Sequence, residues 1–195
     1  MTQAVVRSTL AVVVLTLVLG LAYPLVFTGF AQVVFPNRSD GSLVERDGQV
    51  VGSRLAAQAF TRPEYFHPRP SGTDPAYNAA GTTFSNLGPT NPDLAAAVKE
   101  RAEAILALER PFNPGLQIGD IPVDAVTTSG SGIDPHISPA NARLQTARIA
   151  EERNLPVERV RELVDDNTDG RFLGIFGEPG VNVLELNLAL DEETS

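Results

Sequence analysis

The most regular feature of the sequence is an uncharged, strongly apolar run from Ser8 to Phe35. About 28 residues at 1.5 Å each would form a helix about 42 Å long, which exceeds the roughly 30 Å of hydrocarbon in a bilayer. One charged residue at the centre of such a helix would cost about 2.5–3.5 kcal/mol, so the absence of charges is a specific signal. The pattern predicts one transmembrane helix over 8–35, and Pro24 predicts a kink near its middle.

Two other structures fit part of this run. A cleavable signal peptide would use the small residues around Gly20 and Ala22, but the apolar run continues well past Ala22, where a mature chain should turn polar. A buried helix of a soluble protein is rarely apolar on every face over this length. The transmembrane helix is therefore the favoured interpretation.

The charges that flank the helix predict its orientation. Arg7 and the terminal amine lie on the amino side, whereas the two arginines on the far side, Arg38 and Arg46, are diluted by three acidic residues. By the positive-inside rule, residues 1–7 are expected in the cytoplasm. The chain is thus expected to cross a cell inner membrane once, in contact with membrane lipid, with residues 36–195 forming an extracytoplasmic domain.

Beyond the membrane, the apolar pattern first indicates a hairpin and then loses its period. Asp47-Gly48 lies between two short apolar runs, which is typical of a β-hairpin turn. Residues 60–92 contain six prolines and show no helical period. Because this stretch also carries five aromatic residues, we expect a long ordered loop, packed on the domain or on a partner, rather than a disordered linker.

The remaining pattern predicts three helices and a final strand. Asn91 and Ser138 are each followed by proline, which is typical of a helix start, and apolar stripes extend the two helices to about Glu109 and Asn154. A third helix covers 157–167, and 121–126 is either a short strand or a helical turn. Alternating leucines over 181–190 indicate a half-buried strand. The order predicts a single soluble α+β domain after the transmembrane helix.

Composition narrows the function classes. The chain has no cysteine, so disulfides and thiolate chemistry are excluded. A formal net charge of −9 with one lysine, Lys99, argues against broad electrostatic binding to nucleic acid. Residues 144–164 resemble a helix-turn-helix in outline, but glutamates nearly cancel their arginines. A structural helical hairpin is the favoured interpretation.

The stretch "TTSGSGIDPHISP", Thr127 to Pro139, gathers the residue types used in catalysis. Neither Ser129 nor Ser131 has the flanking glycines of a nucleophile elbow, and the chain lacks a phosphate-binding loop with its lysine. The two histidines have no paired spacing, so we expect no metal site and no catalytic residue. Two interpretations remain: a turn whose glycines allow a tight connection into a helix capped by Ser138, which is favoured, or a cradle of backbone amides for an anion.

Several motifs together resemble one family. "YPLVFTGFAQVVFP", "DGSLV", "VGSRLAAQAF", "YFHPRPSG", "SNLGPTNPDL", "SGSGIDPHISPA" and "GEPGVNVLELNLAL" occur in this order along nearly the whole chain. They resemble the C subunit of the Kdp-type potassium-transporting P-type ATPase. The resemblance implies a non-catalytic accessory subunit that assembles or stabilises the complex. It also implies a catalytic chaperone that raises the ATP affinity of the hydrolytic subunit.

The resemblance also implies partners and contact residues. The partners are the potassium-conducting subunit, the ATP-hydrolysing subunit and a small accessory subunit. No cofactor is expected to bind tightly, and ATP enters through the hydrolytic subunit. Residues for contact with ATP or another anion are Ser129, Gly130, Ser131, Gly132 and His136, in a loop that also carries Asp134 and Ser138. Gln145, one to two turns into the following helix, is a further polar contact. Residues for a partner interface, taken from the matching motifs, are Tyr23, Pro24, Tyr65, Phe66, Arg69 and Asn86.

One consequence of the predicted orientation conflicts with direct ATP contact. If the domain is extracytoplasmic, its loop lies across the membrane from cytoplasmic ATP. We therefore expect the domain to pack on the outer surface of the potassium-conducting subunit, where its acidic surface would influence ion entry. The alternative is a free-standing, membrane-anchored binding protein or hydrolase.

Overall fold

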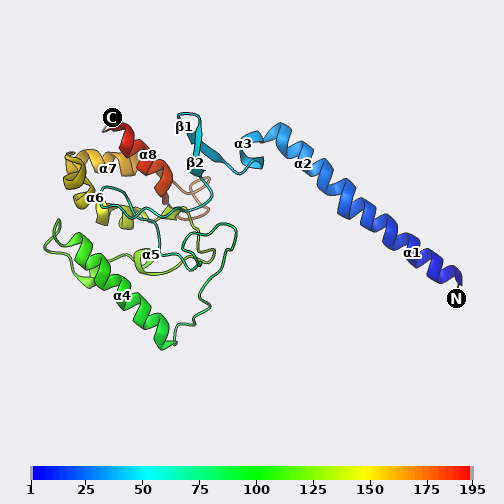
Figure 1. The fold of residues 1–195 in the computed structure, drawn as a ribbon, viewed down its shortest axis with the longest axis horizontal. Coiled ribbons are helices and arrows are strands. Elements are labelled where there is room, and N and C mark those ends of the chain that lie inside the picture. Colours follow the sequence, from blue (N-terminus) through cyan, green and yellow to red (C-terminus); the bar gives the residue numbers. More distant parts are fainter. Residues whose placement is uncertain (1, 194–195) are drawn as a thin grey trace. The chain divides into compact units, whose positions relative to one another are not determined.

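The computed structural model describes residues 2–193, which fall into two compact units that meet between Val51 and Gly52 (Figure 1). The elements of the first unit are α1 (Thr2–Leu17), the π turn η1 (Val18–Ala22), α2 (Tyr23–Val34), α3 (Pro36–Ser39) and β1 (Leu43–Arg46), and β2 (Gln49–Ser53) runs into the second unit. The second unit continues with α4 (Pro92–Glu109), η2 (Ile118–Asp120), α5 (Val123–Val126), β3 (His136–Ile137), α6 (Pro139–Arg153), α7 (Val157–Asp166), β4 (Thr168–Asp169), β5 (Gly180–Asn182) and α8 (Val183–Glu193). This helical domain with a small sheet has the predicted α+β character.

The predicted apolar helix is present and begins earlier than expected. Helical structure is continuous over Thr2–Val34, 33 residues, and by length and composition it can cross a membrane. None of the residues of α1, η1 or α2 is buried, so their apolar side chains are free to meet lipid or another protein. Near Pro24, where a kink is predicted, the helix contains a π turn that ends at Ala22, two residues before the proline. Because proline has no N–H for the carbonyl four residues earlier, a wider turn accommodates the missing hydrogen bond.

The hairpin predicted at Asp47-Gly48 is confirmed. Strands β1 and β2 form a two-stranded sheet, and the two turn residues both have positive φ, 53° and 75°. Positive φ at both central positions is the geometry of a type I′ turn, which Asp-Gly favours because its twist matches that of the strands.

Three helices of the second unit and its three-stranded sheet share one hydrophobic core. The sheet has the order β3-β5-β4 and is antiparallel, with Ile137 and Thr168 both opposite Val181. Helices α6 and α7 pack against each other as the expected structural hairpin, and α8 packs against α7 and β5. The core contains Phe66, Ile137, Ala142, Ile149, Ala150, Val160, Leu163, Val164, Val181, Val183, Leu186 and Leu190.

The helix boundaries follow the predicted caps. The Asn91 side chain accepts a hydrogen bond from the backbone N–H of Asp93 (2.8 Å), and Ser138 Oγ accepts one from Asn141 (3.1 Å). Helix α6 ends at Asn154 in the left-handed conformation, with φ of 53°. The segment left open at 121–126 contains a helical turn, α5, not a strand.

The strand predicted over 181–190 is wrong beyond Asn182. Only Gly180–Asn182 is a strand, and Val183–Glu193 forms α8. Alternating leucines satisfy a strand, but Val183, Asn187 and Leu190 also recur at the spacing of one helix face, and all three are buried. Leucine, glutamate and alanine also favour a helix locally. Local preference and the packing of this face against α7 therefore both favour the helix.

Residues 60–91, the irregular segment, form neither helix nor strand, and side chains from the helices bind its first part. The Asn187 amide accepts from the backbone N–H of Phe66 (2.8 Å) and donates to its carbonyl (3.0 Å). In the same way, the Gln145 amide accepts from the backbone N–H of His67 (2.8 Å) and donates to its carbonyl (3.1 Å). The two amides replace the neighbouring strand that this extended segment lacks, so its buried backbone groups are satisfied.

Arg148 adds to the hydrogen bonds of Asn187 and Gln145, and together these three side chains clamp the irregular segment. Its Nε donates to Glu109 Oε1 at the end of α4 (2.8 Å), and its other nitrogens donate to Gln145 Oε1 and to the carbonyls of Pro63 and Tyr65. The Arg148 side chain is fully buried and that of Glu109 is 3% exposed. Burial raises the pKa of Glu109, and the charge and hydrogen bond of Arg148 oppose that rise. One guanidinium thus joins α4, α6 and the irregular segment.

Replacing Arg148 tests this role. Arg148→Met should lower the free energy of unfolding by about 3–5 kcal/mol, because it leaves the buried carboxylate and two carbonyls unpaired. The measurement is chemical denaturation of the full chain in detergent, followed by circular dichroism. Arg161→Met is the control, since Arg161 is half exposed and pairs with the exposed Glu158; it should change stability by less than about 0.5 kcal/mol. Equal effects of the two substitutions would contradict the role assigned to Arg148.

Candidate functional site

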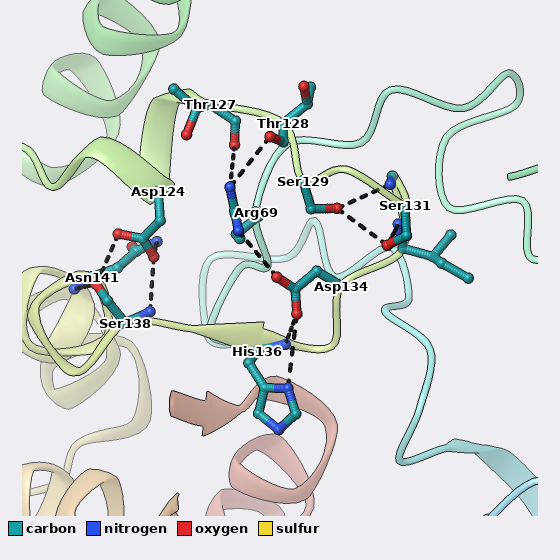
Figure 2. Close-up of polar contacts among 12 residues, drawn as sticks. Arg69, Asp124, Thr127, Thr128, Ser129, Ser131, Asp134, His136, Ser138 and Asn141 are labelled. Carbon is teal, nitrogen blue, oxygen red and sulfur yellow. Dashed lines mark hydrogen bonds and ion pairs between the residues drawn. The ribbon is translucent and has the colours of Figure 1, made fainter. Parts of the chain in front are cut away.

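The loop from Thr127 to Pro139 is organised around an arginine from the irregular segment. Arg69 donates to Asp134 Oδ2 (3.1 Å) and to the carbonyls of Thr128 (3.2 Å) and Thr127 (3.5 Å), as Figure 2 shows. Ser71 Oγ of the same segment donates to the carbonyl of Gly132 (2.7 Å). The loop and the irregular segment therefore form one hydrogen-bonded unit.

Asp134 and His136 form a partly buried acid and imidazole pair. Asp134 Oδ1 accepts the backbone N–H of His136 (3.0 Å) and lies 3.8 Å from its Nδ1 (Figure 2). Burial alone would raise the pKa of Asp134, but the hydrogen bonds from His136 and the charge of Arg69 hold it below its ordinary value. The hydrogen bond to Asp134 raises the pKa of His136 against the effect of burial, and the charges of Asp134, Asp169 and Glu185 add to the rise. The pair favours the charged form of both groups.

The Ser-Gly-Ser-Gly turn uses its own hydroxyls to satisfy its backbone. Ser129 Oγ accepts from the N–H of Gly132 (2.9 Å) and Ser131 Oγ from that of Ile133 (3.2 Å). Gly132 is buried and has φ of 74°; a Cβ there would lie 2.7 Å from the carbonyl oxygen of Thr83. Gly130 is exposed and a Cβ there would meet no atom within 4 Å. Only the second glycine is required by the packing.

A carboxylate of the chain itself occupies the start of α6. Asp124 accepts from the backbone N–H of Ser138 (2.8 Å), from its hydroxyl (2.8 Å) and from the Asn141 amide (3.1 Å; Figure 2). The amino end of a helix attracts negative charge through its free N–H groups and its dipole. Asp124 provides that charge, so the position where a phosphate would bind is already filled.

Four backbone N–H groups at the loop already have acceptors within the chain. The backbone N–H groups of Gly132, Ile133, His136 and Ser138 all donate to oxygens of the loop or of Asp124, and His136 is surrounded by carboxylates that repel an anion. Ser129 Oγ contacts the hydroxyl of Ser131 and accepts from the N–H of Gly132, so it is engaged within its own turn. These hydrogen bonds can hold the loop from Thr127 to Pro139 rigidly against the irregular segment.

Two of the six residues predicted for ATP contact, His136 and Gln145, line different hollows, and residues 129–132 line neither of them. His136 lines a cleft of about 510 Å³ together with Arg69, Asp134 and residues of 169–180. Gln145 lines a mostly apolar pocket of about 380 Å³ between α4, α6 and the irregular segment. The Gln145 amide is committed to the backbone of His67 and to Asn141, so it holds the wall of that pocket.

Known proteins match this chain over nearly its whole length. The family model described as KdpC, K+-transporting ATPase, c chain, matches residues 5–192. The chain is 54% identical to the potassium-transporting ATPase KdpC subunit of Methylobacterium nodulans, with 95% of this chain and 96% of that protein covered. The subunits of Beijerinckia indica and Mycobacterium tuberculosis are each 51% identical, over 98% and 91% of this chain and 94% and 92% of theirs. The chain belongs to the KdpC family.

This KdpC-family chain places the predicted interface residues in different environments. Phe66 is fully buried, so its side chain serves the domain's own core. Tyr65 is half-buried: its hydroxyl bonds Asp191 and its ring lies under the guanidinium groups of Arg62 and Arg153. Tyr23 and Pro24 are exposed on the apolar helix, Arg69 is committed to the loop, and Asn86 is exposed with φ of 54°. Tyr23, Pro24 and Asn86 are thus the most accessible of this set.

Sequence reasoning missed the residues that carry most of the polar architecture: Glu109, Asp124 and the clamp function of Arg148. One signal was available, because Asn141, Gln145 and Arg148 are spaced by four and three residues and so share a helix face. A polar stripe beside the apolar residues of α6 indicates buried hydrogen bonding. Across residues 2–193, no group of three or more metal-ligating side chains is placed to hold a metal ion.

The two glycines of the turn offer a matched test of the structural interpretation. Gly132→Ala should lower the free energy of unfolding by about 1–3 kcal/mol, because alanine disfavours the positive φ and its Cβ meets the carbonyl of Thr83. Gly130→Ala should leave stability unchanged or raise it by up to about 1 kcal/mol. Denaturation of the full chain measures both. A loss of stability as large in Gly130→Ala would mean that the turn has another conformation.

The two histidines should titrate on opposite sides of the ordinary pKa of about 6.5. NMR titration of the imidazole signals should give a raised pKa for His136 and, because of burial and the charge of Arg148, a lowered pKa for His67. Protonated His136 therefore stabilises the fold at low pH and loses this effect as pH rises through its folded pKa; His67 stabilises the fold at higher pH and loses its effect as pH falls.

The control for this titration is Asp134→Asn. It removes the main cause of the His136 shift and should lower the pKa of that residue, while His67 stays unchanged. A single shared pKa for the two histidines, or no response of His136 to Asp134→Asn, would contradict the assigned contacts.

Proposed function

We propose that the chain is a non-catalytic accessory subunit that assembles or stabilises an ATP-driven potassium uptake complex. One observation carries this proposal: in the candidate site, the groups that would do chemistry or bind an anion are paired with one another. Such a domain is suited to holding a fixed shape against partners. The 33-residue apolar helix supplies a second means of contact, inside the membrane.

The arrangement we propose in the cell follows the flanking charges. The amino terminus is cytoplasmic, the helix crosses the inner membrane once, and the domain after residue 35 is extracytoplasmic. The domain packs on the potassium-conducting subunit, within a complex that also contains the ATP-hydrolysing subunit and a small accessory subunit. Membrane lipid surrounds the remaining surface of the helix.

We further propose that any effect on ATP affinity is transmitted through subunit contacts. The loop has few free donors for a phosphate, since four of its backbone N–H groups are already accepted by its own oxygens and by Asp124. The acidic residues around His136 would also repel a nucleotide. The role of catalytic chaperone implied by the resemblance is then an indirect one, without bound ATP in this chain.

Purification and topology test this proposal together. A carboxy-terminal tag on the full chain should retain the other subunits from membranes dissolved in mild detergent, and a membrane-impermeant label should reach that tag from outside the cytoplasmic membrane. The purified chain alone should show no saturable ATP binding in a calorimetric titration. Recovery of the chain as a monomer would sink the accessory role, and saturable binding would sink the indirect effect on ATP. A tagged single-span protein of another complex is the control for non-specific retention.

A further inference from the structure

Four large apolar side chains project from one short turn between β4 and β5. Phe172, Leu173, Ile175 and Phe176 are 72, 74, 72 and 62% exposed. We call these four residues the apolar tip. Soluble domains scatter single apolar residues over their surfaces, whereas four together on five successive positions mark a contact site.

The tip is a folded turn whose backbone is satisfied within itself. The N–H of Phe172 donates to the carbonyl of Phe176 (2.8 Å), and that of Gly174 donates to Arg171 (2.9 Å). Gly174 and Gly177 have φ of 75° and 83°, values that glycine adopts readily. Because the turn has internal hydrogen bonds, little ordering is needed when it meets a partner, and this preserves binding free energy.

The apolar tip forms one wall of the cleft that His136 lines, which we call the acidic cleft. Phe172 and Phe176 line this cleft of about 510 Å³, and carboxylates of Asp134, Asp169 and Glu178 line it from other sides. The side chains of Asp169 and Glu178 are 82% and 79% exposed, so both are accessible from solvent. Arg69 pairs with Asp134, Arg171 pairs with Glu178 (2.6 Å), and His136 Nε2 lies 3.9 Å from Asp169. With Asp124, which also lines the cleft, four carboxylates still outnumber these cationic groups. The cleft therefore presents net negative charge beside aromatic surface.

We propose that the apolar tip and the acidic cleft form one docking surface for a segment of another subunit of the potassium-transporting ATPase. The segment carries a basic side chain that enters the cleft, with apolar residues beside it that cover the tip. This inference rests on the proposed accessory function and names the surface that performs it. Aromatic side chains supply most of the binding energy at such interfaces, and complementary charge sets the register.

A protein segment suits this surface better than a bilayer or a second copy. The surface is concave beside the tip, and its carboxylates have the same sign of charge as anionic lipid headgroups. A second copy of this chain, with its net charge of −9, would bring further negative charge to the cleft.

The first test removes the apolar tip. In the full chain, Phe172→Ser combined with Phe176→Ser should lower the recovery of the other subunits about tenfold or more, since loss of hot-spot side chains weakens binding by at least that factor. The melting temperature of the chain should stay unchanged because both side chains are exposed. Leu55→Ser combined with Ile118→Ser is the matched control, with exposed fractions of 62 and 59% outside the tip, and should retain the subunits normally.

The second test addresses the charge of the cleft. Asp169→Lys should also weaken retention of the subunits, and the loss should diminish as salt is raised during purification. Glu103→Lys is the control, because Glu103 is exposed on α4, away from the cleft, and lies 3.8 Å from Lys99. Retention that is equal for the two charge reversals would overturn the role of the cleft.

Photo-cross-linking identifies the occupant. A photoreactive residue in place of Leu173 should link the chain to another subunit within the complex, and cross-links to lipid alone or to a second copy would overturn the proposal. Normal retention by the chain with serines at both tip positions, while the unaltered chain also retains its partners, would refute the docking surface and leave the accessory function standing. An unaltered chain that retains no partner would refute both.

Discussion

The fold of the second unit depends on how an irregular segment without a neighbouring strand satisfies its buried backbone. Side-chain amides of Asn187 and Gln145 each bind both the N–H and the carbonyl of one residue in this segment. Arg148 binds two further carbonyls and the buried carboxylate of Glu109. An unpaired backbone group in the same place would cost about as much as a lost hydrogen bond, so these three side chains hold in place a stretch that has little local preference of its own.

This arrangement also explains the character of the candidate site. The segment that the helices hold in place carries Arg69 and Ser71, which in turn hold the loop from Thr127 to Pro139. Asp124 then completes the start of α6. Polar residues that suggest catalysis in the sequence are thus paired with one another, and the exposed apolar tip lies at the cleft that Arg69, Asp134 and His136 help to line. A domain of this kind fits an accessory subunit of the KdpC family.

Local signals proved the most predictable. The apolar helix, the hairpin at Asp47-Gly48 and the caps at Asn91 and Ser138 each depend on neighbouring residues, and each is present. The strand predicted over 181–190 was wrong after Asn182. Val183, Asn187 and Leu190 are spaced by four and three residues, so they share one face of a helix, and the alternating leucines did not reveal this. For the site, the turn at Ser129 and the cap at Ser138 could be predicted, since their partners lie within three residues.

The sequence by itself determined the membrane-competent helix, the α+β class, the absence of thiol chemistry and the family. Only the tertiary structure decided which polar residues are paired, because those partners lie far apart in sequence. Arg148 and Glu109 are 39 residues apart, Arg69 and Asp134 65, and Asn187 and Phe66 121. Such contacts depend on how the helices pack, and a sequence pattern reports only the spacing along one element.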